Sequence, residues 1–276
     1  MSAPVPMPFA VQPLPIETCR LVVDPPRAGS LNMAIDELLL NEAIENRTAT
    51  LRFYQWAEPT LSLGYFQSHE DRHYHQASAD CPIVRRTTGG GAILHDKELT
   101  YSFATPVASA SRLNHSDLVN AFHQAASSVL QDAGVTARPL CCDEVPVSQE
   151  KTSEPFLCFQ RRERGDVVTT GEAAIDPSTS PNSKLVGSAQ RRRQGALLQH
   201  GSLLLEQSAQ APELAGCLEH GGKQIDVQSL IVSWCSLLES KLGISLQSAE
   251  LTSEELAKAG RIAAEKFASP GWLERR

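Results

Sequence analysis

The sequence predicts an α+β fold, a mixed β-sheet flanked by helices, and three observations support this prediction. Apolar residues recur at helical spacing in four segments, residues 29–47, 116–134, 226–243 and 252–269. Short runs rich in β-branched and aromatic residues, separated by turn formers, lie between the first three of these segments. The order of helix, strands, helix, strands and two helices indicates a mixed sheet rather than a repeated strand–helix–strand unit.

Capping residues mark the ends of the predicted helices. A side-chain oxygen at the start satisfies free backbone N–H groups, and a glycine after the last turn allows a left-handed backbone. The candidate N-caps are Ser30 or Asn32, Ser116, Asp226 and Ser253, and Gly134 ends the second helix.

Alternating and apolar segments indicate the strands. They cover residues 48–56, 60–66, 81–87 and 91–106, and two strands joined by a basic turn cover residues 184–206. Residues 1–18 are rich in proline and are expected to form a loose N-terminal arm. Residues 169–183 are polar and rich in turn formers, which indicates a hairpin tip or an insertion. Residues 19–276 are expected to form a single domain.

Composition excludes several classes of protein. The 276 residues are 41% hydrophobic and carry a formal net charge of −7, which disfavours a general nucleic-acid binder. No apolar run approaches the roughly 18 residues of a membrane span. The first residues lack the basic and apolar regions of a signal peptide, so we expect a cytoplasmic protein. The seven cysteines include no C-x-x-C pair, so neither a disulfide scaffold nor a zinc ribbon is expected.

The stretch "RRTTGGGAILHD" (residues 85–96) combines three glycines with flanking arginines and a histidine. It lacks the lysine of a Walker A loop, and Leu94 replaces the last glycine of a dinucleotide-binding loop. The glycines allow close backbone approach to a ligand, although an ordinary turn explains them equally well. A second such segment, residues 184–202, holds Lys184 and His200 beside further glycines. The two segments could form opposite walls of one site.

Five motifs, in this order, resemble the lipoate–protein ligase A and octanoyltransferase family: "NMAIDELLL", "PTLSLGYFQ", "VRRTTGGGAILHDKELTYS", "KLVGSAQ" and "LLQHGS". The resemblance runs from about Cys19 to the C-terminus and implies the fold shared with biotin–protein ligases. It also implies attachment of octanoyl or lipoyl groups to a lysine of lipoyl domains. The substrate-binding residues that it implies are Arg85, Arg86, Gly89, Gly90, Gly91, Ala92, His95, Gly187, Ser188, Ala189 and His200.

The resemblance leaves two mechanisms open. Cys158, in "FLCFQRR", is similar in position to the nucleophilic cysteine of the LipM-type octanoyltransferases, which take octanoate from acyl carrier protein without a cofactor. Thiolate is the nucleophilic form, and the Lys184 ammonium is the expected group that stabilises it. The alternative for Cys158 is a buried free thiol.

The ligases of the family instead use ATP and Mg²⁺ to make an acyl-adenylate. Gly91 stands where transferases often carry arginine, which favours the ligase mechanism. The sequence ends with the closing helix and adds none of the accessory domain found in many ligases, which favours the transferase. A lipoyl amidotransferase, which also uses a cysteine, stays open as well, and so does a binding protein without catalysis.

Other polar groups have a functional and an ordinary interpretation. His69, His73, His75 and Cys81 could hold zinc, but their spacing fits no standard finger and solvated helix side chains are expected. Arginines at 161, 162, 164 and 191–193 could dock acidic partners, acyl carrier protein and lipoyl domains, or form a solvated face. Tyr65 and Phe66 could line an acyl channel or pack in the core.

Overall fold

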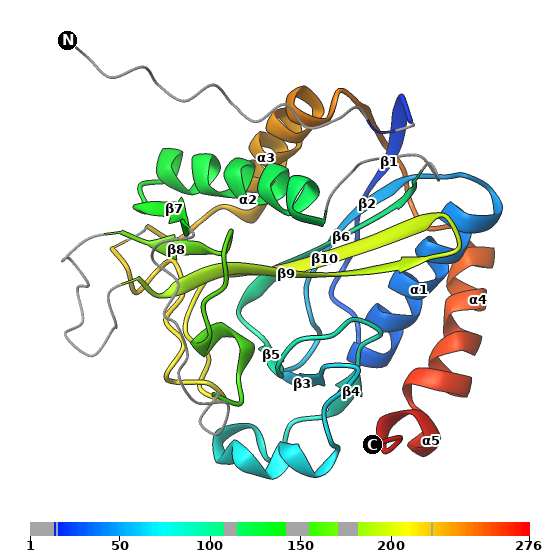
Figure 1. Cartoon of the computed structure of the whole chain (residues 1–276), viewed down its shortest axis with the longest axis horizontal. Coiled ribbons are helices and arrows are strands. Elements are labelled where there is room, and N and C mark those ends of the chain that lie inside the picture. The colour runs from blue at the N-terminus through cyan, green and yellow to red at the C-terminus, as the bar shows by residue number, and fades with distance from the viewer. Residues whose placement is uncertain (1–13, 15, 108–114, 142–154, 171–181, 222) are drawn as a thin grey trace.

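A mixed sheet of eight strands forms the centre of the molecule (Figure 1). In spatial order the strands are β11 (Ser245–Ser248), β1 (Thr18–Val23), β2 (Thr50–Tyr54), β6 (Glu98–Pro106), β10 (Ala196–Leu204), β9 (Lys184–Arg193), β8 (Val167–Thr169) and β7 (Ala137–Pro139). β1 pairs in parallel with β11 and β2, and the other neighbouring strands pair antiparallel. The prediction of an α+β fold around a mixed sheet is therefore confirmed.

The computed structural model describes residues 14, 16–107, 115–141, 155–170, 182–221 and 223–276. Most of the expected N-terminal arm, and the centre of the expected insertion at 169–183, lie outside the described residues. None of the helices in the described ranges combines the length and apolarity that a bilayer-spanning helix requires.

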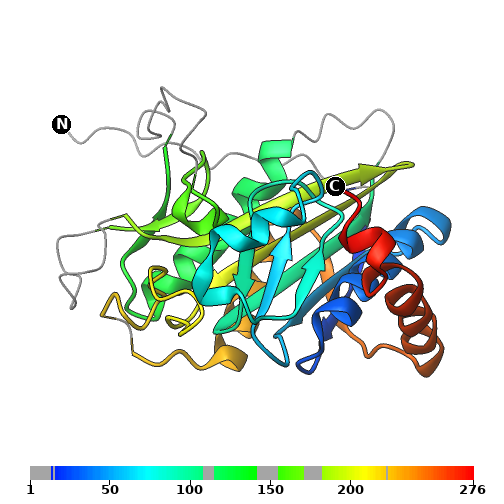
Figure 2. The same ribbon diagram turned by 90° about the horizontal axis from the view of Figure 1, so that it is seen from below.

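A second sheet of three strands, in the order β4 (Ile83–Arg85), β3 (Thr60–Leu63) and β5 (Ile93–His95), lies against the main sheet (Figure 2). Residues 91–106, which were predicted as strand, form two strands, because the chain bends at Asp96 and Lys97. The two strands, β5 and β6, belong to different sheets. This division opens the space in which the candidate site lies.

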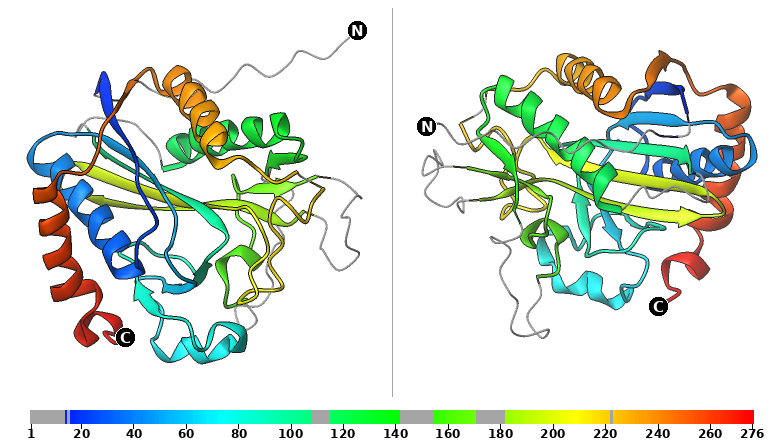
Figure 3. Two further views of the ribbon diagram at one scale, coloured as in Figure 1. Left: turned by 180° about the vertical axis from the view of Figure 1, so that it is seen from behind. Right: turned by 45° about the horizontal axis from the view of Figure 1, so that its top comes forward.

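Helices cover both faces of the main sheet (Figure 3). On one face, α2 (His115–Asp132) and α3 (Val227–Leu242) pack together over the strands. On the other face, α1 (Gly29–Glu45) contacts β6 and β10, and α4 (Ser253–Ile262) packs on α1. A π-helical turn (Ala263–Phe267) and α5 (Pro270–Leu273) follow α4 and lead the chain to β4.

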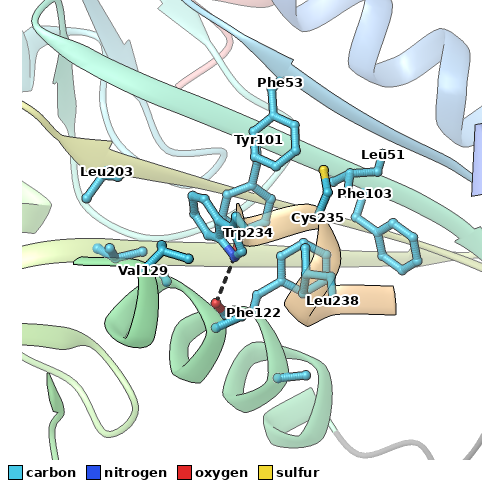
Figure 4. Packing of buried hydrophobic residues seen from close by; sticks show 14 of the residues in the cluster. Leu51, Phe53, Tyr101, Phe103, Phe122, Val129, Leu203, Trp234, Cys235 and Leu238 are labelled. Carbon is cyan, nitrogen blue, oxygen red and sulfur yellow. Dashed lines mark hydrogen bonds between the residues drawn. The ribbon is translucent and has the colours of Figure 1, made fainter. Parts of the chain in front are cut away.

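Aromatic side chains fill the core between the main sheet and the helices α2 and α3 (Figure 4). Trp234 lies 5.6 Å from Phe53 and 5.4 Å from Tyr101 between ring centroids. Its indole N–H donates to the Phe122 carbonyl at 3.3 Å, so the polar atom of this buried ring is satisfied. This core holds the strands that carry the site residues in place.

Several predicted helix caps were wrong by one or a few residues. α1 begins at Gly29 after Ala28, and Asn32 lies inside it, where its amide donates to the carbonyls of Arg27 and Gln55. α4 is capped by Thr252 in a capping box with Glu255, so Ser253 is the first helical residue. Ser30 and Ser116 lie within helices and do not cap them. The predicted cap Asp226 is confirmed for α3, and Gly134 follows α2 with a φ of +87°.

Two other local predictions also differ from the structure. The predicted basic turn between β9 and β10 is formed by Gln194 and Gly195, both with positive φ, so the arginines at 191–193 lie in β9. Residues 70–74 and 76–78 form two short 3₁₀ helices where one ordinary helix was expected.

Candidate active site

A cavity of about 250 Å³ lies between the main sheet and the small sheet. Most of the residues predicted from the sequence line it, namely Cys158, Lys184, Arg86, Gly89, Gly90, His95, Gly187, Ser188, Ala189 and His200. The two glycine segments therefore do form two walls of one site, as their composition suggested.

Cys158 begins a 3₁₀ turn that the small sheet holds in place. Its backbone N–H donates to the Ala92 carbonyl at 2.7 Å, and the Ala92 N–H donates to the Phe156 carbonyl at 3.2 Å. These two bonds attach the segment before Cys158 to the chain that leads into β5. The thiol is thereby placed at the cavity, and it is neither fully buried nor fully exposed.

Lys184 is the first residue of β9, and its side chain reaches Cys158 from the main sheet. The ammonium Nζ lies 3.9 Å from the Cys158 Sγ and 2.8 Å from the Asp166 Oδ2. Gly187 leaves the room that this requires, because a Cβ at that position would lie 2.4 Å from the lysine Cε. Although 26 residues separate them in sequence, Cys158 and Lys184 meet across the two sheets.

Asp166 contacts Lys184 and was not among the residues predicted from the sequence. It precedes β8, and its carboxylate also accepts the Glu163 N–H at 2.7 Å. Gly165 allows the turn before it with a φ of +89°, and the Gly165 carbonyl accepts from the buried His123 Nδ1 at 2.6 Å. In the sequence, Asp166 stands between Gly165 and two valines, and no motif marks it. Its contact with Lys184 depends on the pairing of β8 with β9, which the sequence pattern does not indicate.

Charge interactions among Cys158, Lys184 and Asp166 favour the ionised form of the lysine. Burial disfavours the ammonium, but the facing Cys158 thiolate and Asp166 carboxylate outweigh burial and raise the pKa of Lys184 above its ordinary value. Burial raises the pKa of Asp166 as well, and Lys184 opposes that rise. The 2.8 Å contact and the added Glu163 N–H bond favour an ion pair at neutral pH.

The Arg86 side chain holds the glycine loop by hydrogen bonds to its backbone carbonyls. Its guanidinium donates to the carbonyls of Gly89 at 2.8 Å and Gly91 at 2.7 Å, and to the Ser62 carbonyl at 3.0 Å. Burial lowers the pKa of Arg86 to about 10, and the Cys158 thiolate opposes this shift. Gly90 has a φ of +94°, and its carbonyl lies where a Cβ on Gly64 would be, so both positions require glycine.

Three predicted substrate-binding residues, Arg85, Gly91 and Ala92, lie outside the cavity lining. Arg85 is buried and donates to backbone carbonyls, including those of Leu273 at 2.6 Å and Gln67 at 2.7 Å. Gly91 contributes its carbonyl to Arg86, and Ala92 positions Cys158 through its backbone. Tyr65 and Phe66 are also absent from the lining, and Phe66 is 68% exposed.

His200 joins the cavity to a buried network of charged groups. Its Nδ1 lies 3.2 Å from Asp36, and its Nε2 lies 2.7 Å from the Thr88 hydroxyl in the glycine loop. Asp36 also pairs with Arg52 at 3.1 Å, and Arg52 pairs with Asp24 at 2.7 Å. Burial alone would raise the pKa of Asp36, but His200 and Arg52 outweigh it and lower that pKa.

His95 lies against Trp56 within the cavity lining. The two rings stack with centroids 3.9 Å apart and an interplanar angle of 9°. The His95 Nδ1 lies 2.7 Å from the fully buried Glu98 carboxylate, which also accepts from Ser202 at 2.8 Å. Trp56, Met33, Ile93 and Phe159 supply apolar lining that the sequence alone did not single out.

The histidines considered for zinc make other contacts. His69 and His73 face Glu70, and His75 lies between Ser78 and Glu213. Within the described ranges, no three potential metal-ligating side chains of His, Cys, Asp or Glu gather at one place. In the arginine runs, Arg161 donates to the Pro155 carbonyl and Arg193 contacts Asn41 and Glu37.

The comparison with family models matches residues 29–230 to the lipoyl protein ligase A/B catalytic domain. The chain belongs to this family. The match covers α1, both sheets except β1 and β11, the glycine loop, Cys158 and Lys184. The resemblance inferred from the five motifs is thereby confirmed.

Two named relatives and one solved structure are similar to this chain. The octanoyltransferase LipM of Bacillus anthracis is 31% identical over 88% of this chain and 93% of its own length. The octanoyltransferase LipM of Moorella thermoacetica is 38% identical over 70% of this chain and 67% of its own length. Among solved structures, a putative lipoate protein ligase from T. acidophilum with bound lipoic acid superposes with a TM-score of 0.69. It is 19% identical, and the match covers 93% of this chain and 99% of the other.

Proposed function

We propose that the protein is an octanoyltransferase that moves an octanoyl group from acyl carrier protein to Cys158, and then to a lysine of a lipoyl domain. The observation that carries this proposal is the Lys184 ammonium 3.9 Å from the Cys158 thiol at the wall of a cavity. The LipM relatives, whose names state this activity, support it.

The chemistry follows from these positions. The Cys158 thiolate attacks the carbonyl carbon of the donor thioester, the donor carbon–sulfur bond breaks, and the donor leaves as a thiol after gaining a proton. The acceptor amine then attacks the Cys158 thioester, forms an amide, and releases its proton and the Cys158 thiolate. Because the donor is already a thioester, neither step requires ATP, and we propose that no cofactor takes part.

We infer that backbone N–H groups of the glycine loop stabilise the oxyanion of both steps. Arg86 holds the carbonyls of Gly89 and Gly91, and the N–H groups of Gly89 and Gly90 donate to no group in the described part of the chain. Gly89 and Gly90 line the cavity. Donors that are fixed in this way before the reaction lower the barrier without reorganising.

The size of the cavity suits an acyl chain. Its volume of about 250 Å³ lies just below the range of roughly 300–1,000 Å³ typical of sites for larger ligands. Met33, Trp56, Ile93 and Phe159 supply the apolar contacts that a hydrocarbon chain requires. We propose lipoyl domains of 2-oxoacid dehydrogenases and the glycine cleavage H protein as acceptors.

Intact-mass measurement tests this function. After mixing with octanoyl carrier protein, the enzyme should gain one octanoyl group, which hydroxylamine removes. The adduct should be absent in Cys158→Ala and present in Cys217→Ala, because Cys217 is buried away from the cavity. An unmodified wild-type enzyme, or an adduct that survives in Cys158→Ala, would refute the proposal.

The ligase mechanism is the second candidate, and Gly91 is the observation that favours it. In that mechanism lipoate and ATP with Mg²⁺ would release AMP, and Cys158→Ala would keep this activity. A lipoyl amidotransferase would instead form the Cys158 adduct from a lipoyl protein and not from carrier protein. The same mass measurement with each donor therefore separates the three activities.

Replacing Asp166 by asparagine should change the pH dependence of Cys158 acylation. Asp166 helps to raise the pKa of Lys184, so the ammonium persists above the ordinary lysine pKa and is lost only as pH rises through the raised value. Without the carboxylate, Lys184 should lose its proton at lower pH. The alkaline limb of the rate profile should therefore shift to lower pH. Acylation rates measured over roughly pH 7–11 check this shift.

Asp166→Glu is the matched control, since it keeps the charge and should keep the alkaline limb near its wild-type position. An Asp166→Asn profile that superposes on that of the wild type would contradict this role for the carboxylate.

A further inference from the structure

Three arginines gather beside the cavity, around the rings of Tyr65 and Phe66. We call Arg191, Arg275 and Arg276 the C-terminal arginine cluster. No salt bridge joins any of the three to an acidic side chain in the described ranges, although the whole chain carries a net charge of −7. Among nearby acidic groups, Glu70 faces His69 and His73, and Asp71 accepts the Ser68 N–H.

Aromatic rings hold these arginines in defined places. The Arg275 guanidinium carbon lies 4.2 Å from the centroid of the Tyr65 ring and 4.8 Å from that of Trp272. Arg276 lies 5.2 Å from the Phe66 ring, and Arg191 lies 5.4 Å from the Tyr65 ring. Such cation–π contacts orient a guanidinium and still leave its N–H groups available to an anion.

Hydrogen bonds fix the last residues against the small sheet. The Trp272 indole donates to the Arg85 carbonyl at 2.8 Å, and the Arg85 side chain donates back to Leu273. The His69 N–H donates to the Arg276 carbonyl at 2.8 Å. Figure 2 shows this C-terminal segment beside the chain that carries the small sheet. The cluster is therefore part of the folded surface.

The cluster borders the cavity at the glycine loop. Arg191 donates to the Thr87 carbonyl at 2.6 Å, and the Tyr65 N–H donates to the Thr88 carbonyl at 2.8 Å. A Cβ on Gly89, which lines the cavity, would lie 3.8 Å from the Phe66 ring. Burial lowers the pKa of Arg85, the charges of Arg275 and Arg276 lower it further, and the charge of Asp71 opposes this shift.

We propose that the C-terminal arginine cluster receives the acidic carrier protein that donates the acyl group, an inference that rests on the proposed function. The donor presents anions, namely an acidic surface and the phosphodiester of its prosthetic arm. The acceptor, a lipoyl domain, is acidic as well, but at its reacting end it presents a lysine where the donor presents a phosphodiester. Arginines beside an exposed Phe66 also match the residue types that dominate protein interfaces. The cluster thus favours the donor over the acceptor at this edge of the cavity.

The test compares two acyl donors with the double variant Arg275→Glu/Arg276→Glu. Acylation of Cys158 by octanoyl carrier protein should slow about tenfold or more at low salt, since charge complementarity acts mainly on association. Acylation by octanoyl-pantetheine, which lacks the protein and the phosphate, should keep its wild-type rate. Raising the salt concentration should narrow the difference between variant and wild type.

Matched controls exclude general effects of charge and folding. Lys223→Glu/Arg261→Glu makes the same change in net charge at two exposed residues outside the cavity lining. It should leave both rates unchanged. Arg275→Gln/Arg276→Gln removes the charge with less disturbance of packing and should give a smaller loss with the carrier donor alone.

Other outcomes would overturn the inference. An equal loss with both donors would place the cluster in the acyl site, and no loss would leave it without a docking role. A loss confined to transfer from acylated enzyme to the lipoyl domain would make it the acceptor surface. A wild-type enzyme that octanoyl-pantetheine and carrier protein both fail to acylate would instead refute the proposed function.

Discussion

Replacing Lys184 by methionine is expected to slow acylation of Cys158 by a factor of roughly 10²–10⁴. The variant removes the only ammonium within 4 Å of the thiol in the described structure, so the thiolate loses the charge that stabilises it. Methionine fills a similar volume and keeps the apolar part of the lysine. Single-turnover acylation followed by intact mass measures this effect.

The loss of Lys184 also leaves the Asp166 carboxylate buried without its counter-ion. Breaking a buried pair in this way costs about 3–5 kcal/mol, so Lys184→Met alone could fail by unfolding. The double variant Lys184→Met/Asp166→Asn removes both charges, and its thermal midpoint should return toward that of the wild type. If acylation returns with stability, Lys184 acts only in folding. If stability returns while acylation stays slow, Lys184 acts on the thiol.

Replacing Arg52 by methionine should give a large loss of stability. Arg52 is completely buried and bonds to Asp24 at 2.7 Å, to Asp36 at 3.1 Å and to the Asn32 side chain at 2.7 Å. Its removal leaves two buried carboxylates, and we expect the free energy of unfolding to fall by about 3–5 kcal/mol. Urea unfolding followed by tryptophan fluorescence measures this change.

Arg27→Met is the matched control for this substitution. Arg27 also bonds to Asp24, at 2.8 Å, but 21% of its side chain is exposed, so its loss should cost only about 1 kcal/mol or less. Equal losses in the two variants would show that burial of Arg52 does not determine its contribution.

The pH dependence of this network has a defined sign. Burial opposes ionisation of Asp24, but Arg27 and Arg52 outweigh it and lower the pKa of that carboxyl. The pKa of Asp36 is lowered too, so the stability from both groups is present above the ordinary aspartate pKa. It is lost as pH falls through the lowered values. In Arg52→Met both carboxyls should titrate at higher pH, which would make the variant lose stability earlier on acidification.

The sequence predicted those features that depend on local pattern. Apolar residues at helical spacing located the helices, and the motifs identified the family. Cys158 and Lys184 were chosen from the resemblance, and the structure brings them within 3.9 Å. Their catalytic roles stay predictions until the adduct is measured.

Features that depend on long-range pairing were not predictable from the sequence. Asp166 joins the site because β8 pairs with β9, and no periodicity encodes that pairing. Arg85 was predicted to bind substrate because it precedes the glycine loop. In the structure its side chain donates to the carbonyls of Trp272 and Leu273, 187 and 188 residues away in sequence. The separate small sheet depends on the turn at Asp96 and Lys97, where the strand pattern continues without a break.

The pairing of β8 with β9 also bears on which changes of length the chain can accept beside the site. Val168 stands opposite Lys184, and the Thr169 N–H donates to the Ser183 carbonyl at 2.9 Å, so the two chains are joined next to the site. The position of Lys184 relative to Cys158 is therefore set by strand register and not by the number of residues between Thr170 and Asn182. Doubling the length of a flexible loop whose two ends are held together raises the entropic free energy of closing it by only about 0.6 kcal/mol. A segment of different length between Thr170 and Asn182 should therefore cost little free energy and leave the distance between the thiol and the ammonium unchanged.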